Sequence, residues 1–215
     1  MIKKKNIKNS KKIDKFLIRY LSNQEKSLLV NPMKYGLLSG GKKIRSTVII
    51  DSGKLFNLNE KKILNICASV ECIHSYSLIH DDLPCMDDDS MRRGQPTTHI
   101  KFGEATATLA ADSLQSLAFE SMAKAKFPKS KSTQLDLISM IAKSIGSAGM
   151  AGGQSLDLDS ENKKLDPSTV EKIYMLKTGK LLEASILAPT YFRELSEEQL
   201  SALISFSASI GVAFQ

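Results

Sequence analysis

The chain has 215 residues, of which 42% are hydrophobic and 25% are charged, and its formal net charge is +7. This length and composition suit a folded protein with its own hydrophobic core, and they exclude a disulfide-stabilised miniprotein or a wholly disordered chain. The charge is concentrated in residues 1–15, which hold seven lysines and one aspartate, whereas the other 200 residues carry 23 basic and 22 acidic side chains. Because the body of the chain is almost neutral, we expect no nucleic-acid partner.

From the N-terminus, residues 1–12 are predicted to form a basic flexible arm and residues 13–215 a single domain. The arm lacks the apolar segment of a secretion signal and is rich in lysine where a transit peptide is rich in arginine and serine, so we expect a cytoplasmic protein. The three cysteines show no metal-binding or disulfide pattern. The most apolar stretch, residues 200–214, contains four serines and is too short to span a membrane.

Apolar residues recur with helical spacing along almost the whole chain, and alternating strand-like runs are missing, which predicts an all-α fold. We expect helices at about 12–30, 42–56, 60–81, 97–125, 132–148, 168–188 and from 197 to the end. Helix starts are indicated at Asn59, Pro96, Asp166 and Ser196, and breaks at Pro32, Gly40-Gly41, Gly94, Pro128 and Gly152-Gly153. Long helices joined by short loops form a bundle, in which inward-facing side chains build any ligand site.

Five carboxylates lie within nine residues after the predicted helix 60–81, namely Asp81, Asp82, Asp87, Asp88 and Asp89. Clustered negative charges repel one another unless a cation or water compensates them. Carboxylate oxygens suit Mg²⁺, which joins one or two protein carboxylates to substrate phosphates. The arginines 92 and 93 follow at once and can hold phosphate oxygens, so the segment indicates a site for a metal-bound diphosphate, with a solvated acidic loop as the alternative.

Helical geometry relates this cluster to the preceding helix. His74 and Asp81 fall on the same stripe, two turns apart. Pro84 then interrupts the helix. A straight continuation would align Asp88 with Asp81, whereas a bulge at the proline would bring Asp87 round instead, and spacing alone leaves both possibilities open.

Two further segments contain cationic side chains beside glycines. Residues 40–45 place Lys42 and Arg45 one turn apart at a helix start, which suits a second phosphate group, although a turn with solvated lysines is the simpler interpretation. Residues 177–180 lie within a predicted helix, where Gly179 costs about 1 kcal/mol relative to alanine. That cost indicates a close approach by a ligand, and the spacing of a phosphate-binding P-loop is absent.

The sequence resembles the trans-isoprenyl diphosphate synthases, and most closely the bacterial farnesyl diphosphate synthases. The matching segments occur in family order and are residues 40–45, 71–89, 92–97, 152–158, 177–179 and 210–215. The resemblance implies an all-α isoprenoid synthase fold, a helical bundle around a central cavity that is usually homodimeric. It also implies a prenyltransferase that condenses isopentenyl diphosphate head-to-tail with an allylic diphosphate, either dimethylallyl or geranyl, to give farnesyl diphosphate.

The resemblance assigns a role to individual positions. It gives Asp81 and Asp87 the Mg²⁺ on the allylic diphosphate. The residues it assigns to that diphosphate itself are Arg92, Lys177, Thr178 and Gln215, and those for isopentenyl diphosphate are Lys42, Arg45, His74 and Arg93. Tyr76, five residues before the first aspartate, together with the Leu83-Pro84 insertion, goes with a product of fifteen carbons. A geranyl or geranylgeranyl diphosphate synthase is the alternative for chain length.

Two departures from the family pattern stand out. Ser46 occupies a position where the family usually has proline. The family also has a second aspartate-rich motif, DDxxD, shortly after the Phe-Gln segment, and the sequence stops at Gln215. We therefore expect either a piece of a longer enzyme, with a domain truncated before the second motif, or a non-catalytic prenyltransferase subunit. A class I terpene cyclase would share the aspartates and the helices but would not bind isopentenyl diphosphate.

Overall fold

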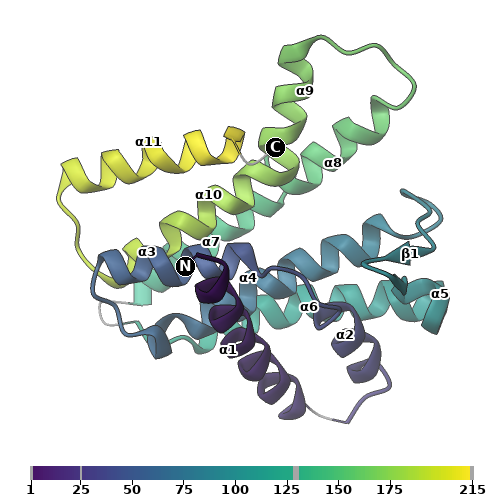
Figure 1. Ribbon diagram of the computed structural model, residues 1–215, viewed down its shortest axis with the longest axis horizontal. Coiled ribbons are helices and arrows are strands. Elements are labelled where there is room, and N and C mark those ends of the chain that lie inside the picture. The colour runs from purple at the N-terminus through teal and green to yellow at the C-terminus, as the bar shows by residue number, and fades with distance from the viewer. Residues whose placement is uncertain (1, 25, 128–130, 214–215) are drawn as a thin grey trace. The chain divides into compact units, whose positions relative to one another are not determined.

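The computed structural model describes residues 2–24, 26–127 and 131–213, which form helices joined by loops and one short hairpin (Figure 1). The first part of the chain contains α1 (Ile2–Ser22), α2 (Val30–Leu37), α3 (Ile44–Leu55), α4 (Glu60–Asp81), β1 (Met91–Arg92), β2 (Gln95–Pro96), α5 (Thr98–Phe102) and α6 (Glu104–Lys124). The second part contains α7 (Lys131–Ile145), α8 (Met150–Asp159), α9 (Pro167–Tyr174), the π-helix η1 (Met175–Gly179), α10 (Lys180–Leu187), the 3₁₀ helix η2 (Ala188–Phe192) and α11 (Glu197–Ala213). The all-α class is confirmed.

The chain divides into two compact units. The first comprises residues 1–47 and 64–125, and the second comprises residues 48–63 and 126–215, so the division crosses α3 and α4. Each unit is described by itself below. The expectation of a single domain stays a prediction.

In the first unit, α4 supplies fully buried side chains that include Ile66, Cys67, Val70 and Ile73. Helix α2 approaches α4 closely, because a Cβ on Gly36 would lie only 2.5 Å from the Cδ1 of Ile79. Helix α6 contacts α4 as well, through a 3.0 Å hydrogen bond from the Ser121 hydroxyl to the Asn65 carbonyl. Packing of this density fixes the C-terminal end of α4, where the acidic segment begins.

In the second unit, η1 lies between α9 and α10 in the chain and packs against α8, while α10 packs against α7 and α11. Phe127 and Phe192 stack with their ring centroids 4.3 Å apart. A π-helical turn is rare and is often found at functional sites, so η1 directs attention to the residues it carries.

Three of the predicted helix starts have the expected caps. The Asn59 side chain accepts a hydrogen bond from the backbone N–H two residues later, at 3.0 Å. Asp166 accepts from the N–H groups of residues 168 and 169, and this bonding holds the pKa of its carboxyl far below the usual range. Ser196 and Gln199 form a reciprocal capping box, because each side chain accepts from the backbone N–H of the other.

The expected helix 12–30 is wrong in both bounds. Helix α1 begins at Ile2, so the lysine-rich segment expected to be a flexible arm is helical. Its buried face carries Ile13, Leu17 and Leu21 at four-residue spacing. The following helix, α2, contains Pro32 in its first turn, where a proline costs no hydrogen bond, so Pro32 does not mark a break.

Two glycine-containing regions also differ from expectation. The expected helix 97–125 is divided at Gly103, whose φ of 84° lies outside the helical region. The glycines 152 and 153, expected to separate helices, lie inside α8. The expected break at Pro128 lies outside the described residues.

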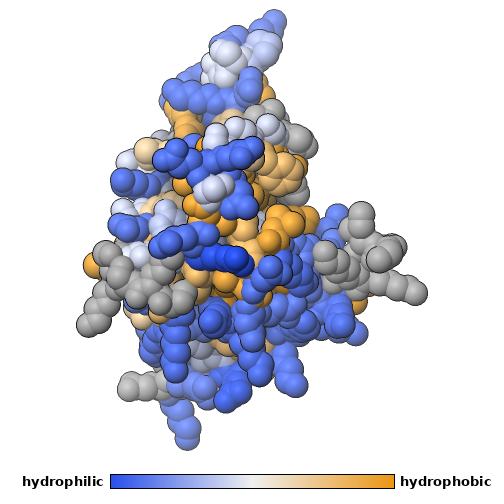
Figure 2. All heavy atoms as spheres, turned by 90° about the vertical axis from the view of Figure 1, so that its left-hand side faces the viewer, coloured by the Kyte–Doolittle hydropathy of each residue, from blue (hydrophilic) through white to orange (hydrophobic). Residues whose placement is uncertain are grey.

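The surface shown in Figure 2 is mostly hydrophilic, with hydrophobic side chains visible in smaller areas between. Among the helices of the described residues, none combines the length and the hydropathy that crossing a membrane requires.

Candidate functional site

The acidic segment turns back on itself after α4. The backbone N–H of Asp87 donates a 2.8 Å hydrogen bond to the carbonyl of Asp81, and Asp88 adopts a left-handed conformation with φ 51°. A continuous helix would instead place residue 85 against that carbonyl. Of the two arrangements that the spacing left open, the backbone therefore follows the one that brings Asp87 next to Asp81.

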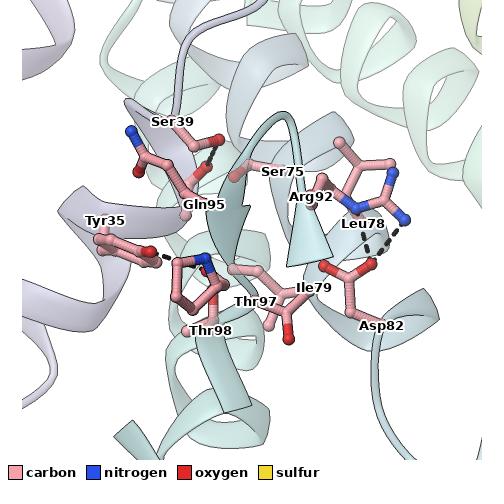
Figure 3. A pocket seen from close by; sticks show the side chains of 12 residues that line it. Tyr35, Ser39, Ser75, Leu78, Ile79, Asp82, Arg92, Gln95, Thr97 and Thr98 are labelled. Atoms are coloured by element: carbon pink, nitrogen blue, oxygen red, sulfur yellow. Dashed lines mark hydrogen bonds and ion pairs between the residues drawn. The ribbon is translucent and has the colours of Figure 1, made fainter. Parts of the chain in front are cut away.

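Asp82 and Arg92 form an ion pair beside this turn, and Figure 3 shows their side chains facing each other. The Arg92 Nε and Nη2 lie 2.6 Å and 2.5 Å from Oδ1 of Asp82, which is buried. Hydrogen bonding to Asp82 raises the pKa of Arg92, while burial raises the pKa of Asp82 and Arg92 opposes that rise. The two short contacts to one carboxylate oxygen hold Arg92 in one orientation.

The hairpin that carries Arg92 is attached to α2. The Tyr35 hydroxyl donates a 2.7 Å hydrogen bond to the Pro96 carbonyl, and the Tyr35 ring meets Phe102 edge-on. A pocket of about 20 Å³ lies between α2, α4 and the hairpin (Figure 3). This volume holds about one water molecule and no prenyl chain.

Arg93 lies against the glycine loop that precedes α3. Its Nη1 donates a 2.7 Å hydrogen bond to the Gly40 carbonyl. Gly41 has a φ of 103°, and a Cβ at this position would lie 2.6 Å from the same Nη1. The close approach therefore requires glycine at position 41, and it brings two segments of the predicted isopentenyl diphosphate site together.

Arg45, His74 and Arg93 form one group of neighbouring residues in the first unit. Burial, together with the charges of Arg45 and Arg93, lowers the pKa of His74 well below its usual value, so the imidazole is neutral at pH 7. Burial also lowers the pKa of Arg45, and the carboxylate of Glu71 opposes that effect. The Nε of Arg45 is buried and has no hydrogen-bond partner within the described part of the chain. A donor left in this state is suited to an anionic ligand.

Three residues near this group were not singled out from the sequence for a role here. These residues are Lys43 and Glu71, which are both buried and oppositely charged, and Ser46, which contacts Glu71. The predicted ligand Lys42, by contrast, is exposed on the loop before α3. The position of Glu71 on the same helical stripe as His74 was the available signal.

In the second unit, the π-helix contains Lys177 and Thr178. The Lys177 Nζ lies 2.6 Å from Oδ2 of Asp157 on α8. Gly153 permits this packing, because a Cβ there would lie 2.2 Å from the backbone nitrogen of Lys177. The close approach of a ligand expected at Gly179 stays a prediction, whereas the close contact at Gly153 is with the protein backbone. Asp157 lies within the matched segment 152–158 but had no role assigned to it.

Tyr76 and Gln215 are the remaining residues predicted for the site. Tyr76 is 8% exposed, meets His80 edge-on at 5.9 Å and is hydrogen-bonded to Gln115. It does not line the small pocket of the first unit. Gln215 lies outside the described residues.

A larger pocket of about 300 Å³ lies between α7 and α10 in the second unit. Its lining includes Lys143, Lys180 and Glu183 but none of the residues predicted for the site. We assign it no part in the chemistry.

The chemistry of the acidic segment fits Mg²⁺. Within residues 2–24, 26–127 and 131–213, no three His, Cys, Asp or Glu side chains gather closely enough to hold a metal by themselves. Mg²⁺ commonly uses one or two protein carboxylates and completes its shell with water and phosphate oxygens. The backbone turn brings Asp87 next to Asp81, and the Mg²⁺ role of these two residues stays a prediction.

Comparisons with known proteins show the family of this chain. The sequence matches the polyprenyl synthetase family over residues 26–215. It is 45% identical to the farnesyl diphosphate synthase of Escherichia coli (strain K12) over 189 residues, which cover 87% of this chain and 63% of that protein. The chain thus spans less than two thirds of that relative's length.

Two crystal structures resemble the whole fold. A geranyltransferase from Legionella pneumophila has a TM-score of 0.93 and 34% identity, with 99% of this chain and 76% of that chain covered. An FPP/GFPP synthase from Zymomonas mobilis has a TM-score of 0.92 and 36% identity, with 99% and 78% covered.

Proposed function

Because the chain belongs to the polyprenyl synthetase family, we propose that it acts as a prenyltransferase that joins isopentenyl diphosphate to geranyl or dimethylallyl diphosphate, giving farnesyl diphosphate. The observation that carries this proposal is the turn after α4, where the Asp87 N–H bonds to the Asp81 carbonyl. That turn gathers two acidic residues at the end of a buried helix, close in sequence to the Arg92-Arg93 pair.

In the proposed mechanism, Asp81 and Asp87 would hold Mg²⁺, which would supply positive charge to neutralise the leaving diphosphate. Arg92, Lys177, Thr178 and Gln215 are assigned to the same allylic diphosphate. Cationic side chains stabilise the charge that develops as the allylic C–O bond breaks and its electron pair leaves with the diphosphate.

Lys42, Arg45, His74 and Arg93 are assigned to the diphosphate of isopentenyl diphosphate. They hold this second substrate so that its double bond attacks the allylic carbocation and forms the new carbon–carbon bond. A proton is then lost from the product to the departing diphosphate. Exclusion of water by apolar helix walls prevents capture of the carbocation.

The proposal also covers the cellular location and the oligomeric state. We place the activity in the cytoplasm. We also expect a homodimer, as the resemblance implies. A geranyl or geranylgeranyl diphosphate synthase remains the alternative for product length, and the FPP/GFPP name of the Zymomonas structure is one reason to measure it. A non-catalytic prenyltransferase subunit is the alternative for activity.

The direct test is product analysis after incubation of the protein with geranyl diphosphate, isopentenyl diphosphate and Mg²⁺. We expect farnesyl diphosphate, formed only when both substrates are present and lost when EDTA removes the metal. Conversion of geranyl diphosphate without isopentenyl diphosphate would identify a terpene cyclase. Product that appears only after a longer prenyltransferase is added would identify a regulatory subunit.

Replacement of Tyr76 by alanine is expected to shift the product toward more than fifteen carbons. The buried ring lies five residues before Asp81, and its removal opens space of the order of several methylene groups along α4. Chromatography of products from geranyl diphosphate measures the shift. Tyr76→Phe, which keeps the ring and loses only the hydroxyl, should retain the wild-type profile, and an unchanged profile for Tyr76→Ala would contradict the assigned role.

A further inference from the structure

The start of α3 is capped by a carboxylate from another helix. Oε1 of Glu71, on α4, accepts a 2.6 Å hydrogen bond from the Ser46 hydroxyl and a 3.3 Å bond from the Ser46 backbone N–H. Ser46 is the third residue of α3, so its N–H is one of the four that have no partner within the helix. A carboxylate at this place is also stabilised by the helix dipole.

The other oxygen of Glu71 faces Lys43, the second buried charge of this cluster. Oε2 lies 3.5 Å from the Lys43 Nζ, and both side chains are at most 5% exposed. The same ammonium donates a 2.8 Å hydrogen bond to the Leu37 carbonyl at the end of α2. Lys43 has a φ of 46°, a conformation that residues other than glycine adopt only when their surroundings hold them there.

These contacts tie both ends of one loop to α4. The loop runs from the end of α2 at Leu37 to Ser46, and it contains Lys42 and Arg45, two of the residues assigned to isopentenyl diphosphate. The directions in which those side chains point depend on how the loop is held.

We propose that Glu71 is a positioning residue for isopentenyl diphosphate, acting through Ser46 and Lys43 on the loop that carries Lys42 and Arg45. This inference rests on the proposed function. Glu71 itself is not expected to touch the substrate, because its two oxygens are already directed at the loop.

Ser46 offers both its backbone N–H and its hydroxyl to the same carboxylate oxygen of Glu71. The Ser46 hydroxyl lies 3.2 Å from the Cys67 carbonyl as well, which adds a second acceptor on α4. A proline at position 46 would offer neither donor, so it could not fasten the loop by these contacts.

The test compares the affinities of wild-type protein and variants for the two substrates by calorimetry, with Mg²⁺ present. Glu71→Gln is expected to weaken isopentenyl diphosphate about tenfold, and Ser46→Ala about threefold, because each loses part of a charged, buried hydrogen-bond set. The affinity for geranyl diphosphate should stay within about twofold. The double variant should bind no more weakly than Glu71→Gln alone, since both changes remove the same contact. Where turnover is measured, KM for isopentenyl diphosphate should rise while kcat changes little.

Asp51→Asn removes a partly exposed carboxylate from α3, the helix that contains Ser46, and serves as the control. This variant should bind both substrates as the wild type does. Equal weakening of both substrates, or no change in either, would overturn the inference. If Glu71→Gln does not fold, the milder Ser46→Ala variant decides by the same criterion. Failure of the wild-type protein to bind isopentenyl diphosphate at all would instead count against the proposed function.

Discussion

Replacing Asp81 or Asp87 with asparagine is expected to lower turnover by about two to three orders of magnitude. Asparagine keeps the size of the side chain and one oxygen but removes the negative charge that Mg²⁺ requires. The same variants should lose Mg²⁺-dependent binding of inorganic pyrophosphate, which calorimetry measures directly. Because Asp87 is exposed and Asp81 is only partly buried at the last residue of α4, the melting temperature should change little.

Asp88→Asn is the matched control for charge in this segment. Asp88 is exposed, and asparagine readily adopts its left-handed backbone conformation. The control should therefore retain turnover within about threefold, as surface changes usually do. A loss at Asp88 equal to that at Asp87 would mean that the metal site follows the straight-helix spacing, contrary to the backbone turn.

The sequence predicted those features that depend on neighbouring residues. Helix α4 has the expected bounds, because its apolar spacing is uninterrupted and Asn59 caps its start. The acidic segment was recognised from its composition, but the choice between Asp87 and Asp88 needed the hydrogen bond across the turn. The spacing of residues along the sequence does not show whether a turn is closed by such a hydrogen bond.

Contacts between distant segments could not be derived from the pattern. The Asp82–Arg92 pair joins residues on either side of the turn at Asp87 and Asp88, in which Asp88 has a positive φ value. The Glu71–Ser46 contact joins residues 25 positions apart. The glycines of α8 indicated a break by composition, yet they lie inside a helix because the backbone of η1 packs against Gly153.

Two cationic residues assigned to the allylic diphosphate have a carboxylate partner within their own unit. Arg92 pairs with Asp82 in the first, and Lys177 pairs with Asp157 in the second. An unpaired, partly buried cation would be costly, and a long flexible side chain would lose conformational freedom on binding. The carboxylates reduce both costs, so we propose that they hold these cations in place before a diphosphate binds.

Gly153→Ala is expected to disrupt the second unit strongly. The new Cβ would lie 2.2 Å from the Lys177 nitrogen and 2.7 Å from its Cα. Because these are backbone atoms, no side chain can move aside, and η1 or α8 has to shift. We expect a destabilisation of about 3 kcal/mol, the upper end for overpacking, and a fall in melting temperature of about 6–12 °C.

The functional readout separates this effect from general loss of stability. Displacement of η1 moves Lys177 and Thr178, so Mg²⁺-dependent pyrophosphate affinity should fall about tenfold at a temperature where the variant is still folded. Gly146→Ala is the control, because its added Cβ would lie 3.3 Å from the Ala142 carbonyl oxygen and 3.9 Å from that of Lys143. This variant should cost at most about 1 kcal/mol and leave the affinity unchanged. If Gly153→Ala matched this control in melting temperature and in affinity, the packing of α8 against the π-helix would not be what positions Lys177.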